Sequence, residues 1–290
     1  MTRGPTSSAT HPARHPTVSV PMSHTEDARM GQSRSPLGVV GLELLAARGW
    51  RAPEQARLGD WLLRAGGGFS ARANSALVVG DPGRPLPEAV DAVTAYYAER
   101  GLPPTVALPG IQARAAGAAF AAAGWDADED VLVLTAPLPA RPDDGRFAVT
   151  LSPAPDRAWL AGYRHRGSEL PADAVDVLVG TEQPEDLAFA AVGLNPAPAP
   201  AAAVARGIVV DNWLGVSAVT VAAEHRRQGL AGAVTAALYR WAAERGAEWA
   251  YLQVSESNAP ARALYRREGF VEHHRYTYRR APSLPAGAGG

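Results

Sequence analysis

Hydrophobic positions follow two different periods in the second half of the chain. Short runs rich in apolar and β-branched residues, at 214–221 and 249–254, are typical of strands. Between these runs Leu230, Val234, Leu238 and Trp241 recur at the spacing of one helix face. The pattern therefore predicts a strand at 214–221, a helix at 229–245 and a strand at 249–254.

The rest of the second half shows the same two periods. It predicts strands at 147–151, 187–193 and 204–210, a last strand pair around 270–278, and helices at 156–166, 170–179 and 259–268. The stretch 195–203 predicts a long hairpin connection between two of these strands. Together the elements predict a mixed α/β fold, with a mostly antiparallel sheet flanked by helices on both faces.

An internal repeat links this half to the residues before it. Residues 92–101 read AVTAYYAERG and residues 233–246 read AVTAALYRWAAERG, and each run predicts a helix that ends at its glycine. Each is followed by a strand and by a second helix that ends in Gly and an aromatic residue. The two glycines lie 23 residues apart in both copies. We therefore predict a duplication, with a first half at 37–138, a linker at 139–145 and a second half at 146–280.

The two ends of the chain differ in composition from these halves. Residues 1–36 are rich in Ser, Thr, Pro and His and hold all three methionines, and residues 281–290 are mostly Ala, Gly and Pro. Neither stretch carries enough large apolar residues to offset the entropy of ordering. We expect a disordered leader at 1–36 and a disordered tail at 281–290. Translation from Met22 or Met30 is the alternative for the leader, which lacks the apolar run of a secretory signal.

Composition narrows the chemistry that is open to the chain. It has no cysteine and its 28 basic residues are all arginine, which excludes disulfides, thiolate ligands and lysine Schiff bases. The formal net charge of −1 argues against a nucleic-acid partner. No apolar run reaches the ~18 residues that a membrane-spanning helix needs. We expect a cytoplasmic monomer or homodimer with no metal and no membrane partner.

The turn before the helix at 229–245 has the features of a phosphate site. It consists of Arg226, Arg227, Gln228, Gly229, Leu230, Ala231 and Gly232. Free N–H groups at a helix N-terminus and the helix dipole favour an anion, and glycine lets it approach closely. The turn therefore predicts a pyrophosphate site. The alternative is an ordinary strand-to-helix turn that carries a solvated arginine pair.

The next strand-to-helix turn carries a second motif. Asn258 is positioned as an N-cap, and it is followed by Pro260, Ala261, Leu264, Tyr265, Gly269 and Phe270. The first turn matches an (R/Q)xxGx(G/A) signature at Arg226, Gly229 and Ala231, preceded by a VxV strand at Val219 and Val221. With both motifs in this order, residues 146–280 resemble the GNAT superfamily of acyl-CoA-dependent N-acyltransferases.

This resemblance implies an acetyl-CoA-dependent N-acetyltransferase that acts on a primary amine of a small molecule or a protein. It implies the pyrophosphate on the N–H groups of 227–232, the pantetheine along Val219 and Val221, and Asn258 in the same cofactor site. Tyr265 is implied as the general acid for the leaving thiolate, with a packing role as its alternative. A mycothiol-synthase-like acetyltransferase and a non-catalytic acyl-CoA-binding regulatory protein are the alternative functions.

The first half has no counterpart of the (R/Q)xxGx(G/A) signature. It therefore looks like a degenerate GNAT-like copy. Its residues 68–75, GFSARANS, resemble a stretch of actinobacterial proteins with two GNAT-like halves. Its residues Arg72, Asn74 and Ser75 face either the substrate cleft or their own turn.

The general base and the acceptor groove are less defined. The strand before VxV lacks the glutamate that many GNAT proteins carry there, which leaves Asp211, Glu256 and water near Ser217 as alternatives. Strand alternation predicts His273 and His274 on opposite faces. Residues expected near the acceptor are Trp159, Tyr163, Arg164, His165 and Trp213, with a role in the core as the alternative for the aromatic ones.

Overall fold

The computed structural model describes residues 1, 2, 4, 35–142, 145–163, 170–171, 174–180, 186–193 and 200–282. The chain divides into two units, Met1–Arg34 and Ser35–Gly290. The second unit holds every helix and strand that the structure describes. The leader predicted at 1–36 and the tail predicted at 281–290 lie almost entirely outside the described residues, so both stay predictions.

The helices agree with the periodicity of the sequence. They are α2 (Val39–Gly49), α3 (Leu86–Ala98), α4 (Arg114–Ala122), α5 (Arg157–Gly162), α6 (Ala174–Val179), α7 (Leu230–Ala243) and α8 (Ala259–Arg267), with short 3₁₀ turns at Ala71–Ala73, Ile111–Ala113 and Ala223–His225. The helices predicted at 229–245 and 259–268 are confirmed as α7 and α8. Those predicted at 156–166 and 170–179 are found as α5 and α6 but are shorter, because Tyr163 is already extended and residues 170 and 171 are not helical. The remaining residues of these two predictions lie outside the described ranges.

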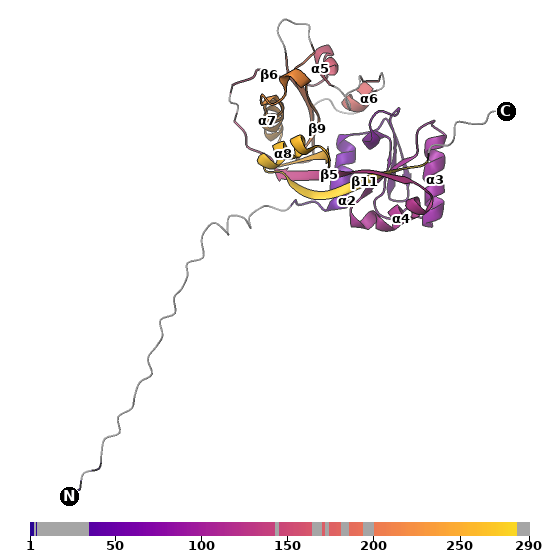
Figure 1. Cartoon of the computed structure of the whole chain (residues 1–290), viewed down its shortest axis with the longest axis horizontal. Coiled ribbons are helices and arrows are strands. Elements are labelled where there is room, and N and C mark those ends of the chain that lie inside the picture. The colour runs from indigo at the N-terminus through magenta and orange to yellow at the C-terminus, as the bar shows by residue number, and fades with distance from the viewer. Residues whose placement is uncertain are drawn as a thin grey trace, which may run out of the picture. The chain divides into compact units, whose positions relative to one another are not determined.

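The described strands form one sheet, in the order β1-β2-β3-β4-β11-β5-β10-β9-β8-β7-β6 (Figure 1). They are β1 (Glu54–Leu58), β2 (Trp61–Ala65), β3 (Ala76–Leu77), β4 (Thr105–Pro109), β5 (Asp126–Pro137), β6 (Val149–Ser152), β7 (Leu187–Val192), β8 (Ala203–Val210), β9 (Trp213–Val221), β10 (Trp249–Ser255) and β11 (Val271–Arg280). The strand pair predicted around 270–278 is wrong, because these residues form the single strand β11.

The sheet confirms the predicted fold class. Two neighbouring pairs, β3 with β4 and β9 with β10, are parallel, and the other neighbours in the described sheet are antiparallel. In β7, Ala188 and Ala190 face a core shared with α7. Leu187 and Phe189 face a second core that includes residues of α5 and α6. Helices therefore cover both faces of this part of the sheet.

The two halves repeat the same local features. β4, α4 and β5 follow α3 in the order in which β10, α8 and β11 follow α7. Gly101 and Gly246, just after α3 and α7, have positive φ angles of 62° and 78°. Gly124 and Gly269, just after α4 and α8, have φ angles of 82° and 90°. This backbone conformation ends helices and favours glycine, which explains the glycine spacing of the repeat and supports the duplication.

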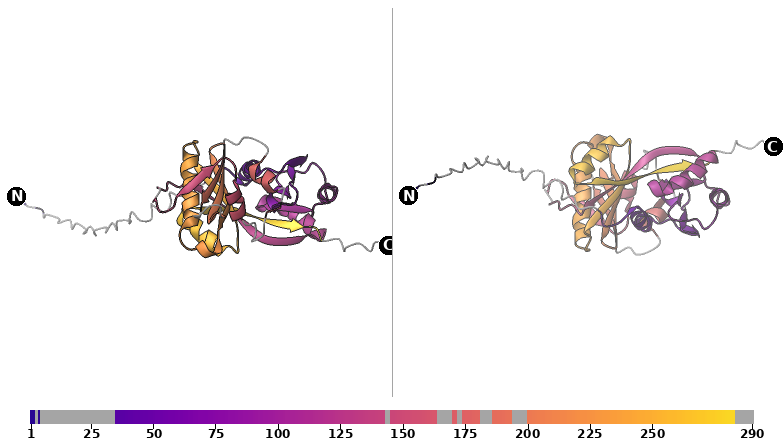
Figure 2. Two further views of the ribbon diagram at one scale, coloured as in Figure 1. Left: turned by 90° about the horizontal axis from the view of Figure 1, so that it is seen from above. Right: turned by 90° about the horizontal axis from the view of Figure 1, so that it is seen from below.

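The two halves exchange their last strands. β5 ends the first half, but it pairs with β10 from Ser255↔Val131 to Trp249↔Pro137. β11 ends the second half, but it pairs with β4 of the first. β5 and β11 also pair with each other, and Figure 2 shows β11, in yellow, running from the second-half strands into the first half. Strands of both predicted halves therefore belong to one sheet, and the boundaries between the halves stay predictions.

We expect a fragment of residues 146–282 not to fold cooperatively. It lacks β5, whose buried Leu132, Val133 and Leu134 line two of the cores. Burial of such side chains contributes about 1.5–3 kcal/mol each, and a whole domain is stable by only about 5–15 kcal/mol. Circular dichroism during heating checks this, with residues 35–282 as the control. A sharp unfolding transition in the 146–282 fragment would contradict the expectation.

Candidate functional site

β9 and β10 separate partway along their length. Their parallel pairing runs from Trp249↔Trp213 to Leu252↔Val216 and then stops. Beyond that point β9 continues beside β8 as far as Val221, and β10 continues beside β5 as far as Ser255. The two strands therefore enclose a V-shaped gap whose edges carry backbone groups without a strand partner.

A β-bulge lies at the start of this gap. Ala218 has a φ of 55°, a left-handed conformation that is uncommon for a residue with a side chain. The pairing of β9 with β8 shifts register here, between Val204 and Arg206. Such a bulge increases the local twist and turns β9 away from a partner.

The backbone of β9 beyond the bulge is oriented for a ligand in the gap. The N–H of Ala222 donates to the carbonyl of Ala202, on the β8 side. Because successive N–H groups of an extended strand point to alternate edges, those of Val219 and Val221 point toward the gap. The side chains of both valines are half-buried against the core beneath α7. The VxV pair thus anchors the strand and offers two donors.

The turn that follows β9 presents a row of free amides. Arg227 and Gly229 have φ angles of 62° and 95°, and α7 begins at Leu230. Within the described part of the chain, the backbone N–H groups of residues 227–232 donate no hydrogen bond, and the first such bond of the helix runs from Ala233 to the carbonyl of Gly229. Six consecutive donors at a helix N-terminus make a site for a phosphate group.

Side chains of this turn mostly stabilise the turn itself. Arg226 Nε donates to the carbonyl of Val221 at 3.4 Å, and Gln228 Nε2 donates to that of Glu224 at 3.3 Å. Arg227 is exposed, whereas Leu230 is buried in the core and fixes the start of α7. Ala231 and Gly232 are small enough to leave the amides open. The predicted binding role of these residues is compatible with this geometry and stays a prediction.

Asn258 has a defined structural role. Its Oδ1 accepts a hydrogen bond from the N–H of Ala261 at 3.2 Å, so it is the N-cap of α8, as the sequence predicts. The role of Asn258 in cofactor binding stays a prediction.

Tyr265 lies on α8 inside the core of the second half. Its side chain is 5% exposed, and its ring packs edge-on against Phe270 with a centroid distance of 5.7 Å. Among the described residues its hydroxyl has no hydrogen-bond partner. Burial raises the pKa of Tyr265 above its ordinary value, so the phenol stays protonated at neutral pH. A protonated, unpartnered hydroxyl is compatible with the acid role.

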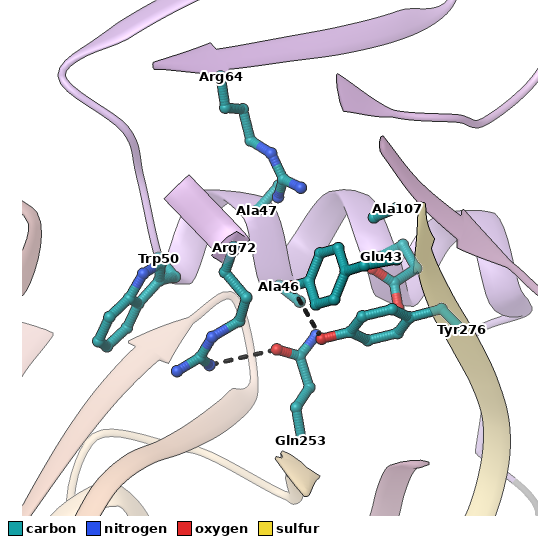
Figure 3. Close-up of a pocket in the computed structure, with 10 residues that line it drawn as sticks. Glu43, Ala46, Ala47, Trp50, Arg64, Arg72, Ala107, Gln253 and Tyr276 are labelled. Carbon is teal, nitrogen blue, oxygen red and sulfur yellow. Dashed lines mark hydrogen bonds between the residues drawn. The ribbon is translucent and has the colours of Figure 1, made fainter. Parts of the chain in front are cut away.

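Arg72 of the first half contacts the second half, which settles an orientation that the sequence did not decide. Arg72 donates to Gln253 Oε1 of β10 at 3.2 Å, and its guanidinium lies 4.2 Å from the ring centroid of Trp50 (Figure 3). By contrast, Asn74 and Ser75 bond within their own region. Asn74 holds the glycine-rich turn through Gly66 and Gly68, and Ser75 accepts from Arg64. Of the three candidates, only Arg72 reaches the second half.

Residues expected near the acceptor are mainly core residues. Trp159 is buried, and its Nε1 donates to the carbonyls of Ala190 and Ala205. Trp213 is buried at the start of β9, the end opposite to the gap, and Tyr163 is also buried. Arg164 and His165 lie outside the described residues. Trp159, Tyr163 and Trp213 are therefore core residues, which is the alternative that the sequence left open, and an acceptor contact at these positions stays a prediction.

The candidate bases do not converge on the gap. Asp211 precedes β9 at the far end and forms an exposed bidentate pair with Arg48. Glu256 follows β10, and its carboxylate accepts from Arg275 at 3.2 Å. Ser217 Oγ lines the cavity at the gap, is buried, and has no partner among the described residues. Of the three alternatives, Ser217 is the one that lines this cavity.

The prediction for the two histidines is wrong. His273 and His274 lie against each other, with their Nδ1 atoms 2.7 Å apart, because a bulge in β11 between Glu272 and His274 breaks the strand alternation. His274 Nε2 lies 2.8 Å from Glu43 Oε1 of α2. Sequence reasoning missed Glu43, which looks like an ordinary polar position of a helix.

The described ranges contain neither a cluster of metal ligands nor a membrane-spanning helix. Within them, no group of three or more His, Cys, Asp or Glu side chains is arranged to hold a metal ion. No helix found there is long and apolar enough to cross a membrane.

Two curated relatives match most of the chain. It is 28% identical over 261 residues to the "Uncharacterized N-acetyltransferase YobR" of Bacillus subtilis, covering 82% of this chain and 98% of that protein. It is 33% identical over 254 residues to the "Probable histone acetyltransferase Rv0428c" of Mycobacterium tuberculosis, covering 84% of this chain and 74% of that protein.

Solved structures share the fold. A GCN5-related N-acetyltransferase from Kribbella flavida superposes with a TM-score of 0.62 at 18% identity, over 86% of this chain and 97% of that one. A tandem GNAT protein of the clavulanic acid pathway gives a TM-score of 0.54 at 15% identity, over 90% and 93%. The family model described as "Probable histone acetyltransferase Rv0428c C-terminal" matches residues 39–279. The chain therefore belongs to this family and is an N-acetyltransferase of the GNAT superfamily.

Proposed function

We propose that the chain transfers the acetyl group of acetyl-CoA to a primary amine by direct attack. One observation carries the proposal. The gap between β9 and β10 joins the six free N–H groups of residues 227–232 to a cavity lined by Ser217 and Gln253. Acetyl-CoA bound by its pyrophosphate to these amides and an amine bound in this cavity would meet inside the gap.

Backbone N–H groups and positive charge of the second half are suited to binding acetyl-CoA. The amides of residues 227–232 would bind the pyrophosphate, and the exposed Arg227 adds positive charge beside them. Residues 219–280 as a whole contain ten arginines, six glutamates and no aspartate, a local charge of +4 that favours an anionic ligand. The N–H groups of Val219 and Val221 would bind the pantetheine and polarise the thioester carbonyl.

The reaction requires little beyond positioning. The amine nitrogen attacks the carbonyl carbon, the carbon–sulfur bond breaks, and the amine loses a proton to water beside Ser217. Tyr265 donates a hydrogen bond to the departing sulfur. Because its pKa is raised above that of a thiol, the phenol stabilises the developing thiolate and does not ionise in advance.

Different observations support a protein lysine and a small amine as the acceptor. The name of the mycobacterial relative suggests a lysine of a protein, whereas the small size of the cavity at the gap suggests a smaller amine. The two-half architecture alone also suits a mycothiol-synthase-like enzyme. Membership of an acetyltransferase family favours all of these over a non-catalytic acyl-CoA-binding protein.

The proposal is tested by thiol release from acetyl-CoA in the presence of an amine panel. The panel contains amino acids, their carboxamides, polyamines, amino sugars and a lysine-rich peptide. We expect steady release of free CoA with at least one class, together with the N-acetyl product by mass spectrometry. Absence of both with every class would overturn the proposed function.

A further inference from the structure

Two adjoining cavities lie where the first half meets the gap in the second. One is lined by Gly215, Val216 and Ser217 of β9, and the other extends to Glu43 of α2 and Tyr276 of β11. Both are also lined by Ala46, Trp50, Arg72 and Gln253. An occupant of the gap therefore contacts side chains of both halves.

These cavities carry an excess of positive charge. Arg64 and Arg72 line the first half side, and Arg206 lines the floor at β8. No salt bridge within the described part of the chain engages any of the three. The single carboxylate in the lining, Glu43, is held by His274 Nε2 at 2.8 Å.

Arg206 is a buried cation without an acidic partner in the described part of the chain. It is fully buried, and its Nε and one terminal nitrogen donate to the carbonyls of Leu178 and Gly49. Burial without an acidic partner lowers its pKa to about 10. A buried cation bound only to neutral acceptors is unfavourable unless a counter-charge arrives. An anionic ligand would supply that counter-charge.

Donors without partners lie at the same place. Trp50 is 3% exposed, and its indole Nε1 has no hydrogen-bond partner among the described residues. Arg72, stacked on the ring of Trp50, has a hydrogen bond to Gln253 as its one bond to the described chain (Figure 3). A buried donor normally has an acceptor, so the N–H of Trp50 can bind one, and the partly buried Arg72 beside it has further N–H groups for the same acceptor.

We propose that Arg72 and Trp50 of the first half bind a carboxylate of the acceptor, which makes the acceptor a small amine that also carries a carboxylate, as amino acids do. This rests on the proposed function and assigns the degenerate half a role in it. The carboxylate lies on Arg72, and the amine of the same molecule faces Ser217 in the gap. A planar guanidinium is suited to pairing with a carboxylate through two parallel hydrogen bonds. A lysine of a basic protein would bring further positive charge to three arginines.

Matched acceptors test the specificity. We expect kcat/KM for amino acids to exceed that for their carboxamides at least about 30-fold, as loss of a charged hydrogen-bond pair predicts. Arg72→Gln should reduce this ratio to within about 3-fold, through the acceptor KM, while the KM of acetyl-CoA stays unchanged. Arg72→Lys should keep part of the preference. Arg114→Gln, the same change at an exposed first-half position, is the control.

Equal use of acids and amides by the wild-type enzyme would overturn the proposal, as would preference for the lysine-rich peptide. It would also be overturned if Arg72→Gln slowed acids and amides alike.

Binding of the product separates this proposal from the proposed function. Calorimetry with N-acetyl amino acids, in the presence of CoA, measures the carboxylate site without turnover. If no amine is acetylated, product binding that is at least about 30-fold weaker in Arg72→Gln still supports the site. Absent binding, or equal binding by wild type and Arg72→Gln, overturns it whether or not the enzyme turns over.

Discussion

Replacing Ala231 with glutamate should weaken acetyl-CoA binding at least about 100-fold without lowering the melting temperature. Ala231 is the second residue of α7, among the free amides of residues 227–232. Two like charges about 4 Å apart near a protein surface repel by roughly 4 kcal/mol, and a 100-fold change in affinity requires about 2.7 kcal/mol. The same glutamate is favourable for folding, because a carboxylate near a helix N-terminus stabilises the helix by about 0.3–1 kcal/mol.

A matched control keeps this test specific. Ala243→Glu places the same charge at the last residue of the same helix, at an exposed position away from the turn. Calorimetry should give wild-type affinity for Ala243→Glu and little or no heat for Ala231→Glu. Gly229 is a poorer choice, because its φ of 95° strains any side chain and would mix folding with binding. Wild-type affinity in folded Ala231→Glu would exclude the pyrophosphate site.

Tyr265→Phe should lower kcat at least about 100-fold with little change in acetyl-CoA affinity or stability. Loss of a positioned proton donor costs typically about 10²–10⁴-fold in rate. The substitution keeps the ring, and therefore the contact with Phe270, and it removes a hydroxyl that has no partner among the described residues. Removal of such a group is close to neutral for folding.

The effect of Tyr265→Phe is measured by free CoA release at saturating acetyl-CoA and acceptor. Tyr239→Phe is the informative comparison, because Tyr239 is also a buried tyrosine of the second half but donates to Glu268 at 2.6 Å. We expect Tyr239→Phe to lower stability more than kcat, and Tyr265→Phe to do the reverse. A wild-type kcat in Tyr265→Phe would contradict the acid role and show that Tyr265 is a packing residue.

Local features of the site were predictable from sequence. The N-cap at Asn258, the helix starts and the row of free amides at 227–232 depend on residues within a few positions of one another. The glycine spacing of the repeat likewise reflects the positive φ that ends a helix, as at Gly101 and Gly246. Such signals depend on local backbone geometry, so periodicity and turn chemistry detect them.

Contacts across the halves were not predictable in the same way. The pairing of Leu134 with Leu252 joins strands more than a hundred residues apart, and an apolar strand fits either half equally well. The hydrogen bond from Arg72 to Gln253 follows from this exchange, and neither residue signals it locally. A bulge reversed the prediction for His273 and His274, because one extra residue changes which face a side chain takes.

A crystal structure of the full chain with bound CoA tests the central claim most directly. We expect the pyrophosphate within hydrogen-bond distance of the amides of residues 227–232 and the pantetheine between β9 and β10. The thiol should lie near Tyr265, with one CoA per chain. CoA bound in the first half, or bound in the second half away from residues 227–232, would contradict the account.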